Sequence, residues 1–192
     1  MAAEGIVLPR QSAKRFAGYE LAFGETMLLL VLGYVLFAIL ALIIQPTGGG
    51  MALGLGHLLF FLGWVMLVLF TAWLAWLPPR LFGGRAEWVD VLPAIAWMHV
   101  LMVPFLGLAL MGLTYLPLDQ MMEAFQDNDQ DRLQEIQESI LPTDRMFSAV
   151  LVNISNFAQL WLFANFVGAL HGFKTGAVAA VTLGFFLILA LL

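Results

Sequence analysis

The sequence predicts an all-α protein, a polytopic membrane bundle of five transmembrane helices with an external amphipathic helical loop. Two observations carry this prediction. Of the 192 residues, 62% are hydrophobic and only 11% are charged, whereas a soluble domain has about 25% charged residues. Most of the chain also falls into apolar runs of about 18 residues or more, a length at which a helix can cross a bilayer.

Residues 1–23 precede the first apolar run and are predicted to form a cytoplasmic interfacial tail. Basic residues stand beside aromatic ones in this segment, a mixture that suits the headgroup layer of a membrane. The alternative is a flank that only sets the orientation of the first span and has no specificity for lipid.

Turn signals divide residues 24–192, the expected transmembrane domain, into five spans. Clusters of glycine and proline follow the first two apolar runs, at Gln45–Gly50 and at Pro78-Pro79-Arg80, where a helix is expected to end. The expected spans cover residues 24–44, 51–77, 91–115, 146–170 and 176–192. The fifth span has about 17 residues, which is close to the minimum for crossing.

Five spans place the two ends of the chain on opposite sides of the membrane, and the cations indicate which side is which. Lys and Arg accumulate in cytoplasmic loops. Two of the eight, Arg132 and Arg145, fall in the loop between spans three and four, and the other six fall on the side of the N-terminus. We therefore expect a cytoplasmic N-terminus and an external C-terminus, in a bacterial inner membrane.

The hydrophilic residues 116–145 form the expected external loop. Apolar residues recur at helical spacing on both sides of Asp127-Asn-Asp129, which predicts two short amphipathic helices, the second capped by this segment. The spacing from Asp127 to Glu138 also matches ligand positions of an EF-hand, but Arg132 stands where that loop requires glycine. Calcium binding is therefore not expected.

The fourth span carries three asparagines and a glutamine, so we expect it to pack against other spans rather than face lipid all round. Its asparagines either form hydrogen bonds to a neighbouring helix or line a polar path. Small residues recur at four-residue spacing in the fourth and fifth spans, which allows helices to approach closely in lipid. The expected helix-packing residues of this hairpin are Asn153, Asn156, Ala164, Gly168, Gly176, Ala180 and Gly184.

No catalytic, metal-binding or cofactor-binding signature accompanies these spans. The sequence has no cysteine, and it lacks the zinc-protease, nucleophile-elbow and phosphate-loop motifs. His57 and His99 are predicted at different depths, so they are not expected to ligate one haem. We therefore expect no enzyme activity and no cofactor, and the net charge of −5 argues against a nucleic-acid partner.

Two connecting segments carry a family resemblance. The first runs from Leu81 to Asp90 (LFGGRAEWVD) and is followed by Ala96-Trp97, and the second runs from Phe166 to Lys174 (FVGALHGFK). Together they resemble the prokaryotic branch of the Yip1-domain family, over about residues 24–190. The DLYGPxW segment of the eukaryotic members is absent. The resemblance implies a five-span, non-enzymatic integral membrane protein that shapes membranes or scaffolds partners.

Two functions follow as expectations. The first is a scaffold that contacts the lipid bilayer and a membrane-protein partner or a second copy of itself through its connecting turns. The alternative is a small-solute transporter or channel subunit that uses the polar face of the fourth span. The candidate interaction residues of the first function are Arg80, Gly83, Gly84, Arg85, His171 and Lys174.

Overall fold

The computed structural model describes residues 23–44 and 55–191, and these ranges are helical apart from short turns. Four helices are long and apolar enough to cross a membrane, and a fifth apolar helix, α9, is shorter. A helix satisfies its own backbone donors and acceptors, as hydrocarbon requires. The predicted all-α membrane bundle is therefore confirmed, whereas the expected tail lies outside the described residues except for Phe23. The helices are α3 (Phe23–Ile44), α4 (Leu55–Leu81), α5 (Trp88–Leu113), α6 (Leu118–Gln126), α7 (Gln130–Ser139), α8 (Pro142–His171) and α9 (Thr175–Leu191).

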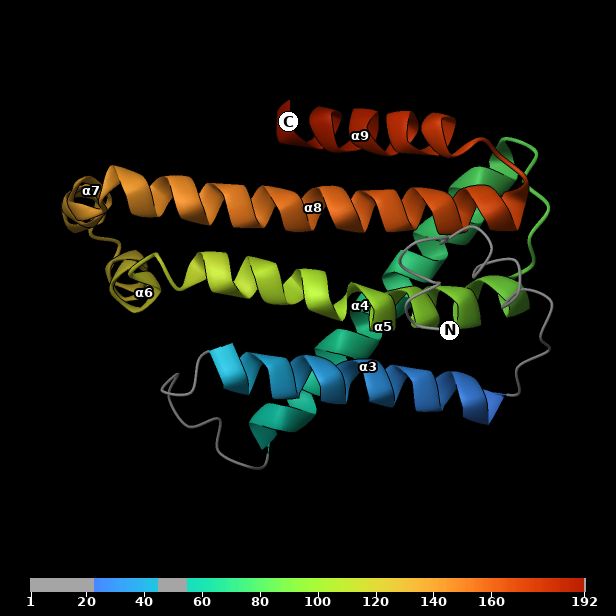
Figure 1. The fold of residues 1–192 in the computed structure, drawn as a ribbon, viewed down its shortest axis with the longest axis horizontal. Coiled ribbons are helices and arrows are strands. Elements are labelled where there is room, and N and C mark those ends of the chain that lie inside the picture. The colour runs from blue at the N-terminus through green and yellow to red at the C-terminus, as the bar shows by residue number, and fades with distance from the viewer. Residues whose placement is uncertain (1–22, 45–54, 192) are drawn as a thin grey trace.

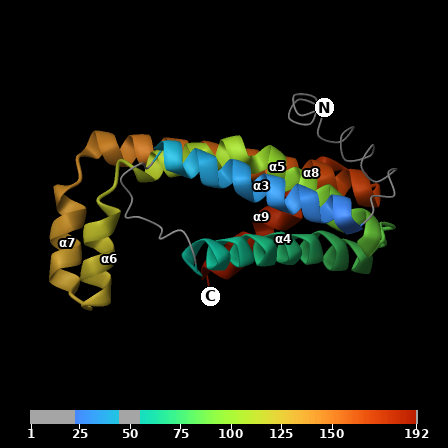
Figure 2. The ribbon, with the colours of Figure 1, turned by 90° about the horizontal axis from the view of Figure 1, so that it is seen from below.

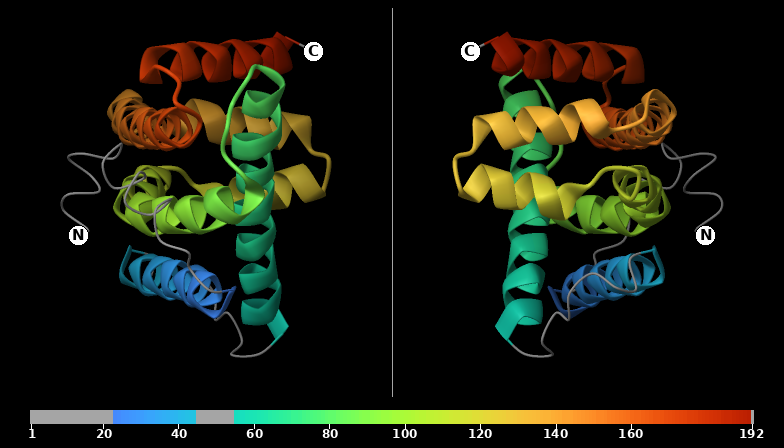
Figure 3. Two further views of the ribbon diagram at one scale, coloured as in Figure 1. Left: turned by 90° about the vertical axis from the view of Figure 1, so that its right-hand side faces the viewer. Right: turned by 90° about the vertical axis from the view of Figure 1, so that its left-hand side faces the viewer.

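The long helices form a row with one helix laid across it. α3, α5, α8 and α9 lie side by side in that order, and α4 runs obliquely across them on one face (Figures 1 and 3). Successive long helices reverse direction, so the start of α3, the α4–α5 turn and the α8–α9 turn share one end of the bundle. We call this the turn end.

α5 is the centre of the bundle. Half of its apolar window is buried, against 11% for α3, and its main neighbours are α8 and α3. The apolar cluster at this centre includes four fully buried side chains: Ile95 and Met98 of α5, Val68 of α4 and Phe166 of α8. In lipid such contacts stabilise by close packing rather than by removal of apolar surface from water.

The predicted amphipathic loop is confirmed. α6 and α7 form a short hairpin that projects sideways at the end opposite the turn end (Figure 2), and Ala124 and Ile136 are buried in it. Asp129 caps α7, because its carboxylate accepts a hydrogen bond of 3.0 Å from the backbone N–H of Arg132. The Arg132 side chain in turn forms an ion pair of 3.1 Å with Glu123 of α6.

The cap of α7 gives a testable result. Asp129→Ala removes the acceptor for the Arg132 N–H, and loss of such a cap costs about 1 kcal/mol of helix stability. We expect amide hydrogen exchange in the first turn of α7 to become about five-fold faster, while exchange in α5 stays unchanged. Asp131→Ala is the matched control, because it removes a carboxylate from the same turn without removing the cap. Equal exchange rates in the two variants would contradict the capping role.

The boundaries of three helices differ from the expected spans. α4 continues four residues past the expected end at residue 77 and includes both prolines. α5 starts at Trp88, three residues early, because Asp90 accepts a backbone hydrogen bond from Glu87 at 3.4 Å. α8 starts at Pro142 rather than at 146, since proline is well suited to the first position of a helix.

The expected small-residue interface between the fourth and fifth spans is wrong on the side of α9. Ala164 and Gly168 of α8 are buried, but Gly176 and Ala180 are exposed. A Cβ added at Gly176 or at Gly184 would meet no described atom within 4 Å. α9 does lie against α8, but not through this stripe.

Close helix contacts instead involve two glycines of α5 that the spacing argument did not identify. A Cβ at Gly107 would lie 2.6 Å from Leu40 of α3, and a Cβ at Gly112 would lie 3.0 Å from the carbonyl oxygen of Ser148 in α8. Glycine therefore allows α5 to approach both of its main neighbours, as expected for small residues in membrane helices.

The asparagines of the fourth span also differ from the expectation. Asn153 and Asn156 are both exposed, so they do not pack against another of the described helices. Asn153 donates a hydrogen bond of 2.8 Å to the carbonyl oxygen of Ala149 in its own helix. The buried polar residues of α8 are Ser148, Ser155, Asn165 and His171.

Candidate functional site at the turn end

Pro79 leaves one backbone carbonyl oxygen of α4 without a hydrogen-bond donor from its own helix, and a side chain of another helix supplies the donor. Proline has no backbone N–H, so the carbonyl oxygen of Ala75, four residues earlier, receives no helical hydrogen bond from that position. Ala75 is fully buried, and a buried carbonyl without a partner is costly. The Nε2 atom of His171, at the end of α8, lies 2.9 Å from this oxygen. His171, 96 residues away in the sequence, therefore supplies the hydrogen bond that α4 lacks at this carbonyl.

This hydrogen bond determines which nitrogen of the His171 ring carries the donated proton. A carbonyl oxygen can only accept, so Nε2 carries the proton and donates, which leaves Nδ1 as the acceptor of the neutral ring. Nδ1 is buried and has no hydrogen-bond partner among the described residues. It faces Gly84 so closely that a Cβ at that position would overlap with the ring.

Three glycines make this arrangement possible, two through their backbone conformation and one through the space that it leaves. Gly83 has φ 87° and Gly172 has φ 77°, a region that residues with a Cβ adopt with strain. Gly172 is the residue that ends α8 directly after His171. Gly84 donates its N–H to the carbonyl oxygen of Pro79 at 2.9 Å and leaves room for the imidazole. The Gly83-Gly84 turn and the His171-Gly172 turn are thus one interlocked unit.

Three further contacts hold the α8–α9 turn in place. Thr175, the first residue of α9, donates a hydrogen bond of 3.2 Å to the side-chain oxygen of Asn165. The amide of Asn165 donates in turn to the carbonyl oxygen of Trp161 at 2.8 Å. The ring of Phe173 stacks on that of His171, with centroids 6.0 Å apart. The His171 ring is therefore held by its hydrogen bond to Ala75 and by the stacked ring of Phe173.

The surface of the turn end combines cations with exposed apolar side chains. Arg80, Arg85 and Lys174 are all exposed, and the Arg80 guanidinium lies 5.7 Å from the centroid of the Trp76 ring. Leu81 and Phe82 are 77% and 78% exposed. Long apolar side chains beside cations are typical of a segment in the interfacial layer of a membrane.

The structure brings together the candidates His171 and Gly84 and places Gly83 in the same turn. It leaves Arg80, Arg85 and Lys174 exposed at the surface of that end. Sequence reasoning missed Ala75, Pro79 and Asn165. Pro79 offered a usable signal, since a proline retained within a helix leaves one carbonyl that needs a donor.

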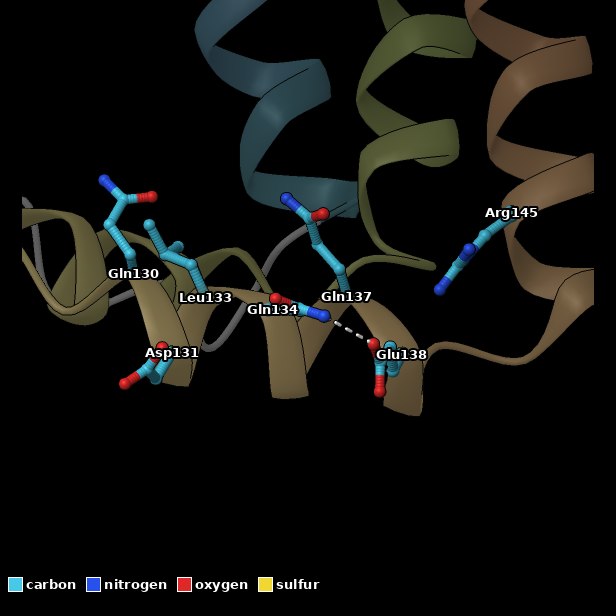
Figure 4. Close-up of a pocket in the computed structure, with 7 residues that line it drawn as sticks. All are labelled: Gln130, Asp131, Leu133, Gln134, Gln137, Glu138 and Arg145. Atoms are coloured by element: carbon cyan, nitrogen blue, oxygen red, sulfur yellow. Dashed lines mark hydrogen bonds between the residues drawn. The ribbon is translucent and has the colours of Figure 1, made fainter.

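Other parts of the described chain offer weaker sites. An open depression beside α7 is lined mainly by glutamines and acids, with Arg145 at its edge, and Gln134 donates to Glu138 at 2.9 Å (Figure 4). No group of three potential metal-ligating side chains occurs within residues 23–44 and 55–191. His99 is buried, with its Nδ1 2.9 Å from the carbonyl oxygen of Ile95. The side chain of His57 lies outside the described residues.

Comparison with known proteins identifies a family but no related structure. No curated protein and no solved structure matches the chain. The family model for the Yip1 domain matches residues 6–192, which is nearly the whole sequence and includes both interlocked turns. The chain therefore belongs to the Yip1 domain family and is an integral membrane protein.

Proposed function

We propose that this protein is a non-enzymatic membrane scaffold that holds its turn end in the cytoplasmic headgroup layer, where it contacts anionic lipid. The observation that carries the proposal is the interlocked pair of turns. These turns hold Arg85 and Lys174 at the same end of the bundle, beside the exposed Leu81 and Phe82.

The distribution of charge supports a cytoplasmic turn end. Three of the five cations in the described ranges, Arg80, Arg85 and Lys174, lie there, and Arg132 and Arg145 lie at the opposite end. Arg132 is paired with Glu123, which reduces the free positive charge of that end further. Cations on the cytoplasmic side contribute about 1 kcal/mol each when they lie near an anionic surface. The proposal places the protein in a bacterial inner membrane with its N-terminus inside.

Lipid enrichment around the protein tests the proposal. We expect the double variant Arg85→Gln, Lys174→Gln to lower the association of spin-labelled phosphatidylserine with the full chain several-fold, because each cation near the surface contributes about 1 kcal/mol. The measurement is electron spin resonance in mixed phosphatidylcholine and phosphatidylserine bilayers at low and high salt, since screening weakens such attraction.

The matched control removes two cations from the other end. Arg132→Gln, Arg145→Gln changes the net charge equally, and with symmetric bilayers it reports any contribution of the α6–α7 end. We expect a smaller change, because Arg132 already contacts Glu123 and Asp127, at 3.1 and 3.9 Å. Equal losses in both double variants, or no loss at the turn end, would contradict the proposal.

The alternative, a transporter or channel subunit, requires the polar residues of α8 to face a cavity. Asn153 and Asn156 lie on the exposed surface of the single chain, and Gln159 donates to Ser155 in its own helix at 2.9 Å. These positions do not favour a polar path through one copy. Water-soluble maleimide would label Asn153→Cys and Asn156→Cys in intact membranes if they lined such a path, whereas the scaffold proposal expects no labelling.

A further inference from the structure

The exposed asparagines of α8 belong to a regular stripe. Its residues are separated by three, four, three and four positions, which is the heptad spacing of helices that pack along a shared seam. Of the five, only Leu160 is half-buried, and the rest are exposed. The stripe consists of Met146, Ala149, Asn153, Asn156 and Leu160.

No described helix covers this stripe. α9 runs beside the second half of α8 and does not extend along the first half (Figure 1). α5 packs against the opposite side of α8, where Ser148 and Ser155 are buried. The described helices therefore leave the seam open over about four helical turns of a segment that crosses the membrane.

The depth of the two asparagines makes their exposure informative. Asn153 and Asn156 lie eight and eleven residues after Arg145, the last charged residue before the apolar part of α8. At 1.5 Å per residue they are about 12 and 17 Å deeper than Arg145, which is near the middle of a hydrocarbon core of about 30 Å. A carboxamide at that depth has no water to bond, so exposure to lipid is unfavourable.

We infer that the stripe is the interface of a parallel homodimer, in which α8 of one copy packs against α8 of a second. A carboxamide both donates and accepts, so it is complementary to itself. Two copies in one membrane with the same orientation, related by an axis along the membrane normal, bring each asparagine opposite its own counterpart at equal depth. Asn153 donates to Ala149 within its helix, and its side-chain oxygen then accepts from the second copy.

Disulfide crosslinking tests the interface directly, because the chain has no native cysteine. We expect copper-phenanthroline oxidation in membranes to link single-cysteine variants Ala149→Cys and Asn156→Cys into dimers. Ile154→Cys is the matched control, since Ile154 is 48% exposed but lies about 120° around the helix from the centre of the stripe. Equal crosslinking of Ile154→Cys, or none at the stripe positions, would overturn the inference.

The affinity of the dimer gives a second, independent measurement. We expect Asn153→Ala and Asn156→Ala each to raise the dissociation constant in lipid about three-fold to twenty-fold, the range for interhelical hydrogen bonds in membranes. Energy transfer between labelled copies at increasing lipid dilution measures it. Ile154→Ala, which also truncates an exposed side chain of α8, is expected to leave the constant unchanged. Unchanged affinity in both asparagine variants, or single-step photobleaching of the wild-type chain in dilute bilayers, would refute the dimer.

Discussion

Gly84→Ala is expected to lower the free energy of unfolding by about 1–3 kcal/mol, the usual cost of inserting an atom into a packed site. The added Cβ would overlap with the His171 ring and would lie 2.8 Å from the carbonyl oxygen of Pro79. One of these neighbours is a backbone atom and the other is a ring held by Ala75 and Phe173. Neither can move without breaking the interlocked turns, so relaxation offers little relief.

The measurement is reversible unfolding of the full chain in mixed micelles, and Gly63→Ala is the matched control. Gly63 lies in α4, and a Cβ there would meet no described atom within 4 Å. Alanine has the higher helix propensity, so this variant is expected to be as stable as the wild type or more stable by up to about 1 kcal/mol. Equal stability of the two alanine variants would show that the Gly84 contact with His171 is not needed.

His171→Phe is expected to cost about 1–3 kcal/mol of unfolding free energy, because it leaves the buried carbonyl oxygen of Ala75 without a donor. Phenylalanine keeps a ring in the site, so most of the packing against Phe173 is retained. The cost should depend on Pro79. In a Pro79→Ala background the new backbone N–H can bond the Ala75 oxygen within α4, and we expect His171→Phe to cost less by about 1 kcal/mol or more.

The control for this cycle is Pro78→Ala. It also restores one N–H in the last turn of α4, but that group points at the carbonyl oxygen of Leu74, not at that of Ala75. His171→Phe should therefore keep its full cost in the Pro78→Ala background. If the two proline backgrounds gave the same cost, the contact of 2.9 Å between His171 and Ala75 would not be an important hydrogen bond.

These two experiments also bear on how the family motifs are understood. The Gly83-Gly84-Arg85 and His171-Gly172 turns carry the resemblance to the Yip1 domain family. The structure gives the glycines and the histidine a structural explanation. His171 bonds the carbonyl oxygen that Pro79 leaves without a helical donor, Gly84 leaves room for its ring, and Gly83 and Gly172 adopt a positive φ. The cations at the same end, Arg85 and Lys174, are not needed for the interlock. They remain available for the lipid contact that we propose.

The sequence by itself determined the fold class, the helical hairpin within residues 116–145 and the family. Each depends on local information, namely the length of the apolar runs, helical spacing around Asp129 and two short turn segments. The sequence also predicted that His171 and Gly83-Gly84 belong to the same functional region. It could not assign the contact between His171 and Ala75, because nothing local shows which donor reaches the carbonyl freed by Pro79.

Only the tertiary structure decided which faces of the helices are covered. Periodicity identified the small residues of α9 and the asparagines of α8 as packing positions, but Gly176 and Asn156 are both exposed. The reason is physical. Small or polar residues permit close contact but do not specify the neighbouring helix. Which helices are neighbours depends on the oblique path of α4 and on α9, which runs beside only the second half of α8. Gly107 and Gly112 of α5 therefore make the close contacts, and the asparagine stripe is left for a second copy.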